Sequence, residues 1–217
     1  MLGGESEMKD IAKKLRDIFE NQKIYYLMVL LFFCVGIVIG VYAVKYMNMP
    51  DRQDISSYYS SFVNSLSNKP INYGLLLIEV IKKNALIIIP IIILSFTFFG
   101  APFILAINLI KGFSLGYSFT FLLTTFSGKG IYLALSSIIP QNLIYIPCLI
   151  AISIISLNSS TERFREKFIK KKVYKKSSNN GLANILIILL CIFILGIVIE
   201  TYVSPNLMKF IITKFYM

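Results

Sequence analysis

Side chains that commonly perform catalysis or bind metal ions are scarce in this sequence of 217 residues. It contains no histidine, and its three cysteines, Cys34, Cys148 and Cys191, lie in separate apolar runs without a CxxC pair. Thiolate metal sites and disulfide frameworks need paired or clustered cysteines, so we expect inert, buried thiols. Of the 11 acidic residues, only Glu200 lies within a long apolar run, near its end. Without histidine, acid–base catalysis would need carboxylates, so we expect no enzyme, no metal and no cofactor.

Two amide side chains, Gln141 and Asn142, follow Pro140 in the middle of an apolar run. Unsatisfied polar groups are costly in hydrocarbon, but Pro140 frees a backbone carbonyl that these amides could bond, and Pro147 adds a second break. Asn108 is a further candidate partner. Two interpretations stay open: a hydrogen-bonded kink that locks a helix bundle, or a substrate path built on a discontinuous helix. We favour the kink, because no ionisable residue accompanies the break, and coupled transport of protons or ions usually needs one.

Composition indicates that these residues belong to an integral membrane protein. The chain is 56% hydrophobic and only 15% charged, with a mean hydropathy of +0.73. The net charge of +11 comes from basic residues grouped between apolar runs. Positive-inside bias explains that grouping, so we do not expect nucleic-acid binding.

The apolar runs predict an all-α membrane domain over residues 24–203 with five spans, at residues 24–44, 85–107, 112–128, 131–157 and 182–203. The first run has 21 residues, which as helix covers about 31 Å, the thickness of the hydrocarbon core. We place a short linker at residues 108–111, between the second and third spans.

Charge fixes the expected orientation. Residues 1–23 and 162–176 hold five and eight basic residues, which places both segments in the cytoplasm. An even number of crossings must separate them, so the short run 112–128 has to cross the membrane. The C-terminal tail, residues 204–217, is then extracytoplasmic.

Two segments outside the spans have amphipathic patterns. Residues 1–23 read as a basic amphipathic helix, either on the anionic inner leaflet or packed on the protein itself. The external segment 46–83 contains a second helix, whose apolar face opposes serines. It is either a surface lying on the membrane or bundle, which we favour, or a partner-docking surface. The residues of its apolar face that we consider for binding are Ile55, Tyr58, Tyr59, Phe62 and Leu66.

Two GxxxG pairs lie in the predicted spans, Gly36 with Gly40 and Gly112 with Gly116. This spacing lets helix backbones approach closely. We expect intramolecular packing rather than a homodimer face, although a homo-oligomer stays open.

The sequence resembles the stage II sporulation protein M family, five-span membrane proteins of endospore-forming bacteria. The likeness rests on Pro140-Gln141-Asn142-Leu143 followed by Ile146-Pro147, on Asn108-x-x-x-Gly112-x-x-x-Gly116, and on the basic loop before the last span. It implies a non-enzymatic scaffold in the bacterial cytoplasmic membrane, in the mother-cell and septal membrane during engulfment. The implied partners are two peptidoglycan-degrading proteins, stage II sporulation proteins D and P. The alternative is a permease-like subunit that moves a small solute, paired with an ATPase through its cytoplasmic loop.

Overall fold

A computed structural model describes residues 23–68, 70–168 and 179–215, and these residues form helices joined by short turns, with no strand among them. The elements are α2 (Lys23–Lys45), α3 (Met49–Asn68), α4 (Tyr73–Ser95), α5 (Gly100–Thr125), α6 (Ser127–Phe168), α7 (Asn179–Val198), the π-helical segment η1 (Ile199–Val203) and α8 (Ser204–Phe215). Four helical stretches are long and apolar enough to cross a membrane: Lys23–Lys45, Gly100–Thr125, Gly130–Phe168 and Ile185–Lys214. The prediction of an all-helical, multi-pass membrane protein is confirmed. Most of segment 1–23, with its expected amphipathic helix, lies outside the described residues.

The predicted boundary between the second and third spans is wrong. Residues 108–111 form no linker, because α5 runs without interruption from Gly100 to Thr125 and carries Lys111 near its middle. The chain instead turns at residues 96–99, between α4 and α5. Asn72 caps the start of α4, accepting a hydrogen bond from the backbone N–H of Leu75 at 3.2 Å. The predicted spans 85–107 and 112–128 are therefore replaced by α4 and α5.

The predicted end of the last span is also wrong. Residues 204–217 were expected to be an external tail, but α7, η1 and α8 follow one another directly, and the apolar stretch extends to Lys214. Glu200 consequently lies near the middle of the stretch Ile185–Lys214 rather than at its end.

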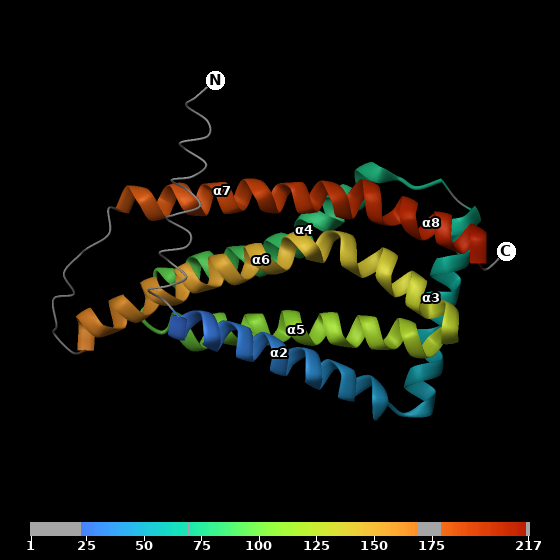
Figure 1. Cartoon of the computed structure of the whole chain (residues 1–217), viewed down its shortest axis with the longest axis horizontal. Coiled ribbons are helices and arrows are strands. Elements are labelled where there is room, and N and C mark those ends of the chain that lie inside the picture. The colour runs from blue at the N-terminus through green and yellow to red at the C-terminus, as the bar shows by residue number, and fades with distance from the viewer. Residues whose placement is uncertain (1–22, 69, 169–178, 216–217) are drawn as a thin grey trace, which may run out of the picture.

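Helix α2 lies along α5, and the two glycine pairs meet at their interface (Figure 1). The buried residues of α2, which include Gly36 and Gly40, recur every three or four positions and form one stripe. A Cβ atom on Gly36 would lie 2.1 Å from the Leu109 carbonyl oxygen, and one on Gly112 would lie 2.1 Å from that of Phe33. Glycine is thus required for the backbones to approach this closely.

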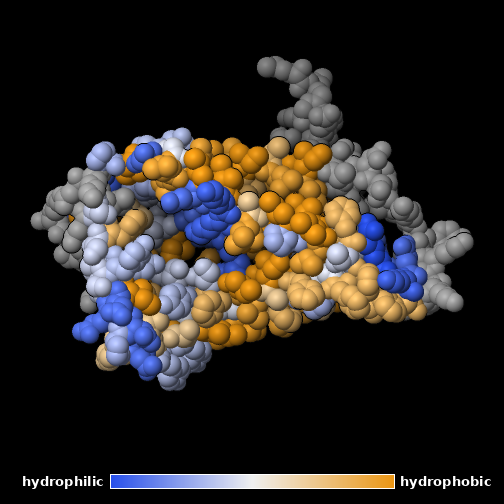
Figure 2. All heavy atoms as spheres, turned by 180° about the vertical axis from the view of Figure 1, so that it is seen from behind, coloured by the Kyte–Doolittle hydropathy of each residue, from blue (hydrophilic) through white to orange (hydrophobic). Residues whose placement is uncertain are grey.

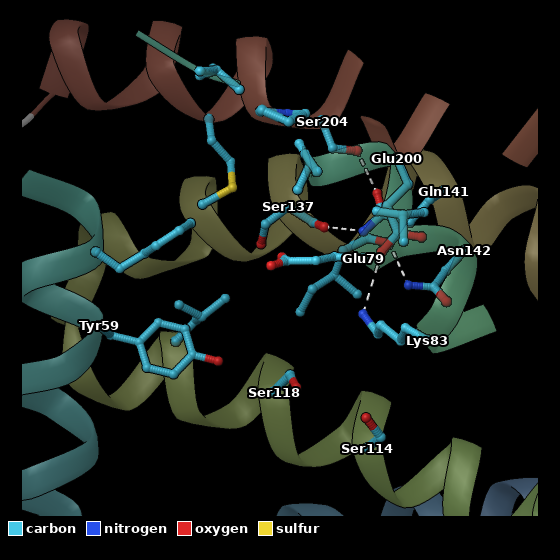
Figure 3. Close-up of a pocket in the computed structure, with 18 of the residues that line it drawn as sticks. Tyr59, Glu79, Lys83, Ser114, Ser118, Ser137, Gln141, Asn142, Glu200 and Ser204 are labelled. Carbon is cyan, nitrogen blue, oxygen red and sulfur yellow. Dashed lines mark hydrogen bonds and ion pairs between the residues drawn. The ribbon is translucent and has the colours of Figure 1, made fainter. Parts of the chain in front are cut away.

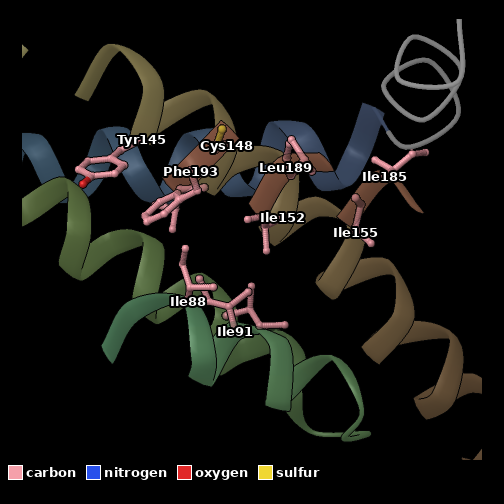
Figure 4. Close-up of a cluster of buried hydrophobic side chains, with 12 residues drawn as sticks. Ile88, Ile91, Tyr145, Cys148, Ile152, Ile155, Ile185, Leu189 and Phe193 are labelled. Atoms are coloured by element: carbon pink, nitrogen blue, oxygen red, sulfur yellow. The ribbon is translucent and has the colours of Figure 1, made fainter. Parts of the chain in front are cut away.

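A second region of the core joins α4, α6 and α7 (Figure 4). Ile88 and Ile91 of α4 face Tyr145 and Ile152 of α6, with Phe193 of α7 against Tyr145 at 4.5 Å between ring centroids. Helix α6 has 42 residues and would be about 63 Å long if straight, so it exceeds the thickness of a bilayer. Figure 1 shows it changing direction partway along its length.

Helix α3 crosses one end of the bundle, beside α8 and the turn between α5 and α6 (Figure 1). Val63 is buried with Leu133 of α6 and Ile212 of α8. The Tyr59 ring packs on Phe121 of α5 at 5.3 Å between centroids. The amphipathic helix expected within segment 46–83 is therefore packed on the bundle through part of its apolar face.

Candidate functional site

A cavity of about 600 Å³ lies among α3, α4, α5, α6 and the η1–α8 segment. Figure 3 shows side chains from these elements directed toward one space. Its lining is rich in polar groups, which are Tyr59, Ser65, Asn72, Glu79, Lys83, Lys111, Ser114, Ser118, Ser137, Gln141, Asn142, Glu200 and Ser204. Polar groups at this density within an apolar bundle make the cavity the candidate functional site.

Glu200 is the centre of the hydrogen-bond network in the cavity wall. Its carboxylate accepts hydrogen bonds from the Tyr145 hydroxyl at 2.7 Å and the Asn84 amide at 3.0 Å, and it pairs with the Lys83 ammonium at 3.3 Å. The side chain of Glu200 is only 12% exposed, whereas that of Lys83 is 64% exposed. The Asn84 amide also donates to the Tyr145 hydroxyl at 3.1 Å. The network joins α4, α6 and η1 through one largely buried carboxylate.

Local backbone structure positions this carboxylate. Glu200 lies in η1, a π-helical segment of five residues between two α-helices. An inserted π turn shifts the side chains that follow it around the helix axis, and such segments are frequent at functional sites. Four residues earlier, a Cβ atom on Gly196 would lie 2.6 Å from the Tyr145 ring, so glycine leaves the room in which Tyr145 reaches Glu200.

Lys111 brings a second positive charge to the cavity. Its ammonium lies 5.6 Å from the centroid of the Tyr145 ring, a cation–π distance. In the described part of the chain, no carboxylate lies within the 4.0 Å ion-pairing distance of this ammonium. Lys111 shares one face of α5 with Ser114 and Ser118, at helical spacings of three and four residues.

The amides beside Pro140 lie at the cavity, in a helix that remains continuous. Gln141 donates to the Ser137 carbonyl and accepts a hydrogen bond from the Ser204 hydroxyl at 2.6 Å. Asn142 donates to the Ile138 carbonyl at 2.7 Å, and its amide oxygen is buried without a hydrogen-bond partner among the described residues. Helix α6 stays continuous through Pro140 although it changes direction along its length, and η1 is the segment that departs from the α-helical hydrogen-bond pattern.

Two of our other sequence-based placements differ from the structure. Asn108 does not pair with Gln141 or Asn142; its amide donates to the Ser153 hydroxyl of α6 at 2.8 Å. The prediction that no ionisable residue accompanies the break is wrong. Glu200, Lys83 and Lys111 line the same cavity as Gln141. Pro147 is exposed on α6 and does not line the cavity.

The five residues considered for partner binding differ in location and exposure. Tyr59 and Phe62 line the cavity, Ile55 is half-buried, and Tyr58 is 71% exposed. The side chain of Leu66 lies outside the described part of the structure.

The cavity network was missed because its members are far apart in the sequence. One signal was present: Lys111, Ser114 and Ser118 form a polar stripe on the side of a helix that does not carry Gly112. A lysine within such a stripe faces a polar interior, whereas a lysine at a span boundary has no such neighbours.

The fold and cavity together define an all-helical, multi-pass membrane protein with a polar site among its helices. The family model of stage II sporulation protein M matches residues 29–205, and the chain belongs to that family. It is therefore a sporulation-related membrane protein. Comparison with curated proteins and with solved structures gave no match.

Proposed function

We propose that the protein is a membrane scaffold that anchors and recruits peptidoglycan-degrading partners during engulfment. The proposed partners are stage II sporulation proteins D and P, and the proposed site is the mother-cell and septal membrane. Family membership supports a role in sporulation. The scaffold role rests on one structural observation: α3 packs across the end of the bundle and leaves one of its sides exposed.

One side of helix α3 packs on the bundle, and the other side, called the open side below, is exposed. Tyr59 and Val63 fix it to α5, α6 and α8, while Tyr58 is 71% exposed. Ser57 and Ser61 are exposed as well. A tyrosine on a fixed helix gives a partner a large contact area at low conformational cost, as in the anchor residues of protein interfaces.

The proposed topology has five crossings, formed by α2, α4, α5, α6 and the continuous α7–η1–α8 stretch. The turn at residues 96–99 packs on the basic end of α6: Lys167 lies 3.7 Å from the Phe98 ring centroid, and Ser160 donates to the Thr97 carbonyl at 2.8 Å. By the positive-inside rule this end is cytoplasmic, and α3 is then extracytoplasmic, near the cell wall. A cysteine at Thr97 or Ser57, in a background without native cysteines, tests this with a membrane-impermeant thiol reagent. We expect labelling of intact cells at Ser57→Cys only, and labelling at Thr97→Cys instead would contradict the topology.

The scaffold role is tested by co-purification from sporulating cells. Tyr58→Asp places a charge on the open side of α3 and should greatly reduce recovery of both hydrolases. Gln53→Glu is the matched control, because it adds a negative charge to an exposed residue of the same helix that points about 140° away from Tyr58 around the helix axis. Membrane insertion of both variants is checked by fractionation. Equal recovery of the hydrolases with Tyr58→Asp and Gln53→Glu would remove the Tyr58 face of α3 from the recruiting surface.

The cavity favours a second candidate, a permease-like subunit paired with an ATPase. Ionisable residues facing a cavity between helices are a feature of transport paths. The cytoplasmic contact for an ATPase would be the basic segment 162–176, of which residues 162–168 continue α6. Stimulated ATP hydrolysis by a co-purified ATPase after reconstitution would favour this candidate over the scaffold.

A further inference from the structure

We propose that the cavity binds the headgroup of a zwitterionic phospholipid, with Lys111 meeting the phosphate and Glu79 the ammonium group, and with the acyl chains lying along α4 and α5. The proposal goes beyond the scaffold role and does not depend on it.

The charges lining the cavity are balanced, and one of each sign is unpaired. The lining contains Lys83, Lys111, Glu79 and Glu200. Lys83 and Glu200 pair with each other at 3.3 Å, whereas no ion pair to Lys111 or Glu79 exists among the described residues. An unpaired charge among apolar helices is costly, so an occupant with one group of each sign would stabilise both side chains. A phosphodiester carrying an ammonium group has this charge pattern.

The cavity opens sideways, into the flank of the bundle. Glu79, Lys83 and Ser114 line it and are also exposed at the surface. Figure 2 shows hydrophilic residues beside a hollow, which lies between the largely hydrophilic end of the molecule that carries α3 and an apolar flank. A headgroup would therefore enter from the plane of the membrane, because an opening in this flank faces lipid when the helices span the bilayer.

Apolar surface continues from the charged opening toward the turn at residues 96–99. On α4, exposed residues follow Lys83 at helical spacing, and on α5 they precede Ser114 in the same way. They are Leu86, Ile89 and Ile93 on α4, and Phe103 and Ile110 on α5. A polar cavity joined to two apolar stripes matches a molecule with a headgroup and acyl chains better than it matches a soluble zwitterion. In the proposed topology the chains point toward the cytoplasmic end, as in an outer-leaflet lipid.

The experiment is native mass spectrometry of the purified full chain titrated with phosphatidylethanolamine. Parallel titrations use phosphatidylglycerol, which lacks the ammonium group, diacylglycerol, which lacks the headgroup, and glycerophosphoethanolamine, which lacks the chains. We expect phosphatidylethanolamine to bind most tightly. Lys111→Met should weaken its binding by about tenfold or more, the effect of losing a charge-assisted hydrogen bond.

Lys82→Met is the matched control, since Lys82 neighbours Lys83 on α4 and is exposed but does not line the cavity. Glu79→Gln should weaken binding of phosphatidylethanolamine and leave binding of phosphatidylglycerol unchanged. Ser118→Phe fills the cavity without removing a charge and should abolish binding of phosphatidylethanolamine. It covers the case in which Lys111→Met fails to fold.

Three results would overturn the proposal. Equal loss of binding with Lys111→Met and Lys82→Met would show that the contact is a general surface charge. Equal affinity for glycerophosphoethanolamine would make the ligand a soluble zwitterion, and equal or higher affinity for phosphatidylglycerol or diacylglycerol would remove the paired charges from recognition.

Discussion

The two sides of α5 are packed in opposite ways. On one side Gly112 and Gly116 lie against the backbone of α2, where a Cβ atom would come within 2.3 Å of carbonyl oxygens. On the other side Lys111, Ser114 and Ser118 face a cavity of about 600 Å³. The first side has no room for one additional methyl group, and the second leaves space for a ligand.

The difference shows how one membrane helix serves both stability and binding. Close backbone contact maximises van der Waals attraction, which is the main source of helix association where lipid removes the hydrophobic driving force. The rigid α2–α5 pair can then hold one wall of a polar cavity in place. The other walls, α4, α6 and η1, are joined by hydrogen bonds through Glu200. We expect the glycine side to determine folding and the polar side to determine specificity.

The largest effect is predicted at the glycine side. Gly112→Val places a branched side chain against the Phe33 carbonyl, where the Cβ atom alone would lie at 2.1 Å. The helices must separate, so we expect a loss of about 3 kcal/mol or more in the free energy of unfolding, at the upper end of overpacking costs. Unfolding in sodium dodecyl sulfate, followed by circular dichroism, measures it.

The control for this prediction is Gly74→Val, in the first turn of α4, where the Cβ atom would meet only the Asn72 side-chain oxygen at 3.5 Å. We expect Gly74→Val to change the unfolding free energy much less than Gly112→Val. Similar losses in the two variants would mean that the helix backbones are not in close contact.

An intermediate effect is predicted for the carboxylate that joins the cavity walls. Glu200→Leu removes the acceptor of the Tyr145 hydroxyl and Asn84 amide and leaves the Lys83 ammonium unpaired. We expect a loss of about 3 kcal/mol, the cost of leaving the buried Tyr145 hydroxyl and Asn84 amide without this acceptor. Glu200→Gln keeps an acceptor oxygen and should lose less. If both variants were as stable as the wild type, the network would not hold the walls together.

Much of the fold followed from hydropathy and charge, because span length and basic clusters are local properties of the sequence. The spans near residues 24–44 and 131–157 overlap α2 and α6, and the basic segment 162–176 begins at the end of α6. The errors arose at charged residues. Lys111 was interpreted as a span boundary and Glu200 as a residue near the end of a span. A charge at the membrane surface and a charge facing an internal cavity look alike in one sequence.

The candidate site was harder to predict from the sequence than the fold, for a physical reason. Asn84, Tyr145 and Glu200 are separated by more than 50 residues along the chain, and only the packing of α4, α6 and η1 brings them together. The π segment at Glu200 has no sequence signature that separates it from the α-helices on either side. Gln141 and Asn142 were found because proline marked them, and their place at the cavity came from the structure alone.

The smallest effect on the free energy of unfolding is predicted on the cavity side of α5. It tests whether the two sides of this helix differ in packing. Ser114→Val introduces the same side chain as Gly112→Val, two residues away on the same helix. Ser114 lines the cavity and is exposed, so the added methyl groups meet open space. We expect the free energy of unfolding to change by no more than about 0.5 kcal/mol, as at positions free of tight packing. The same unfolding assay measures both variants side by side. A loss with Ser114→Val as large as that with Gly112→Val would show that α5 is packed equally on both sides, and the cavity would then be closed in the folded protein.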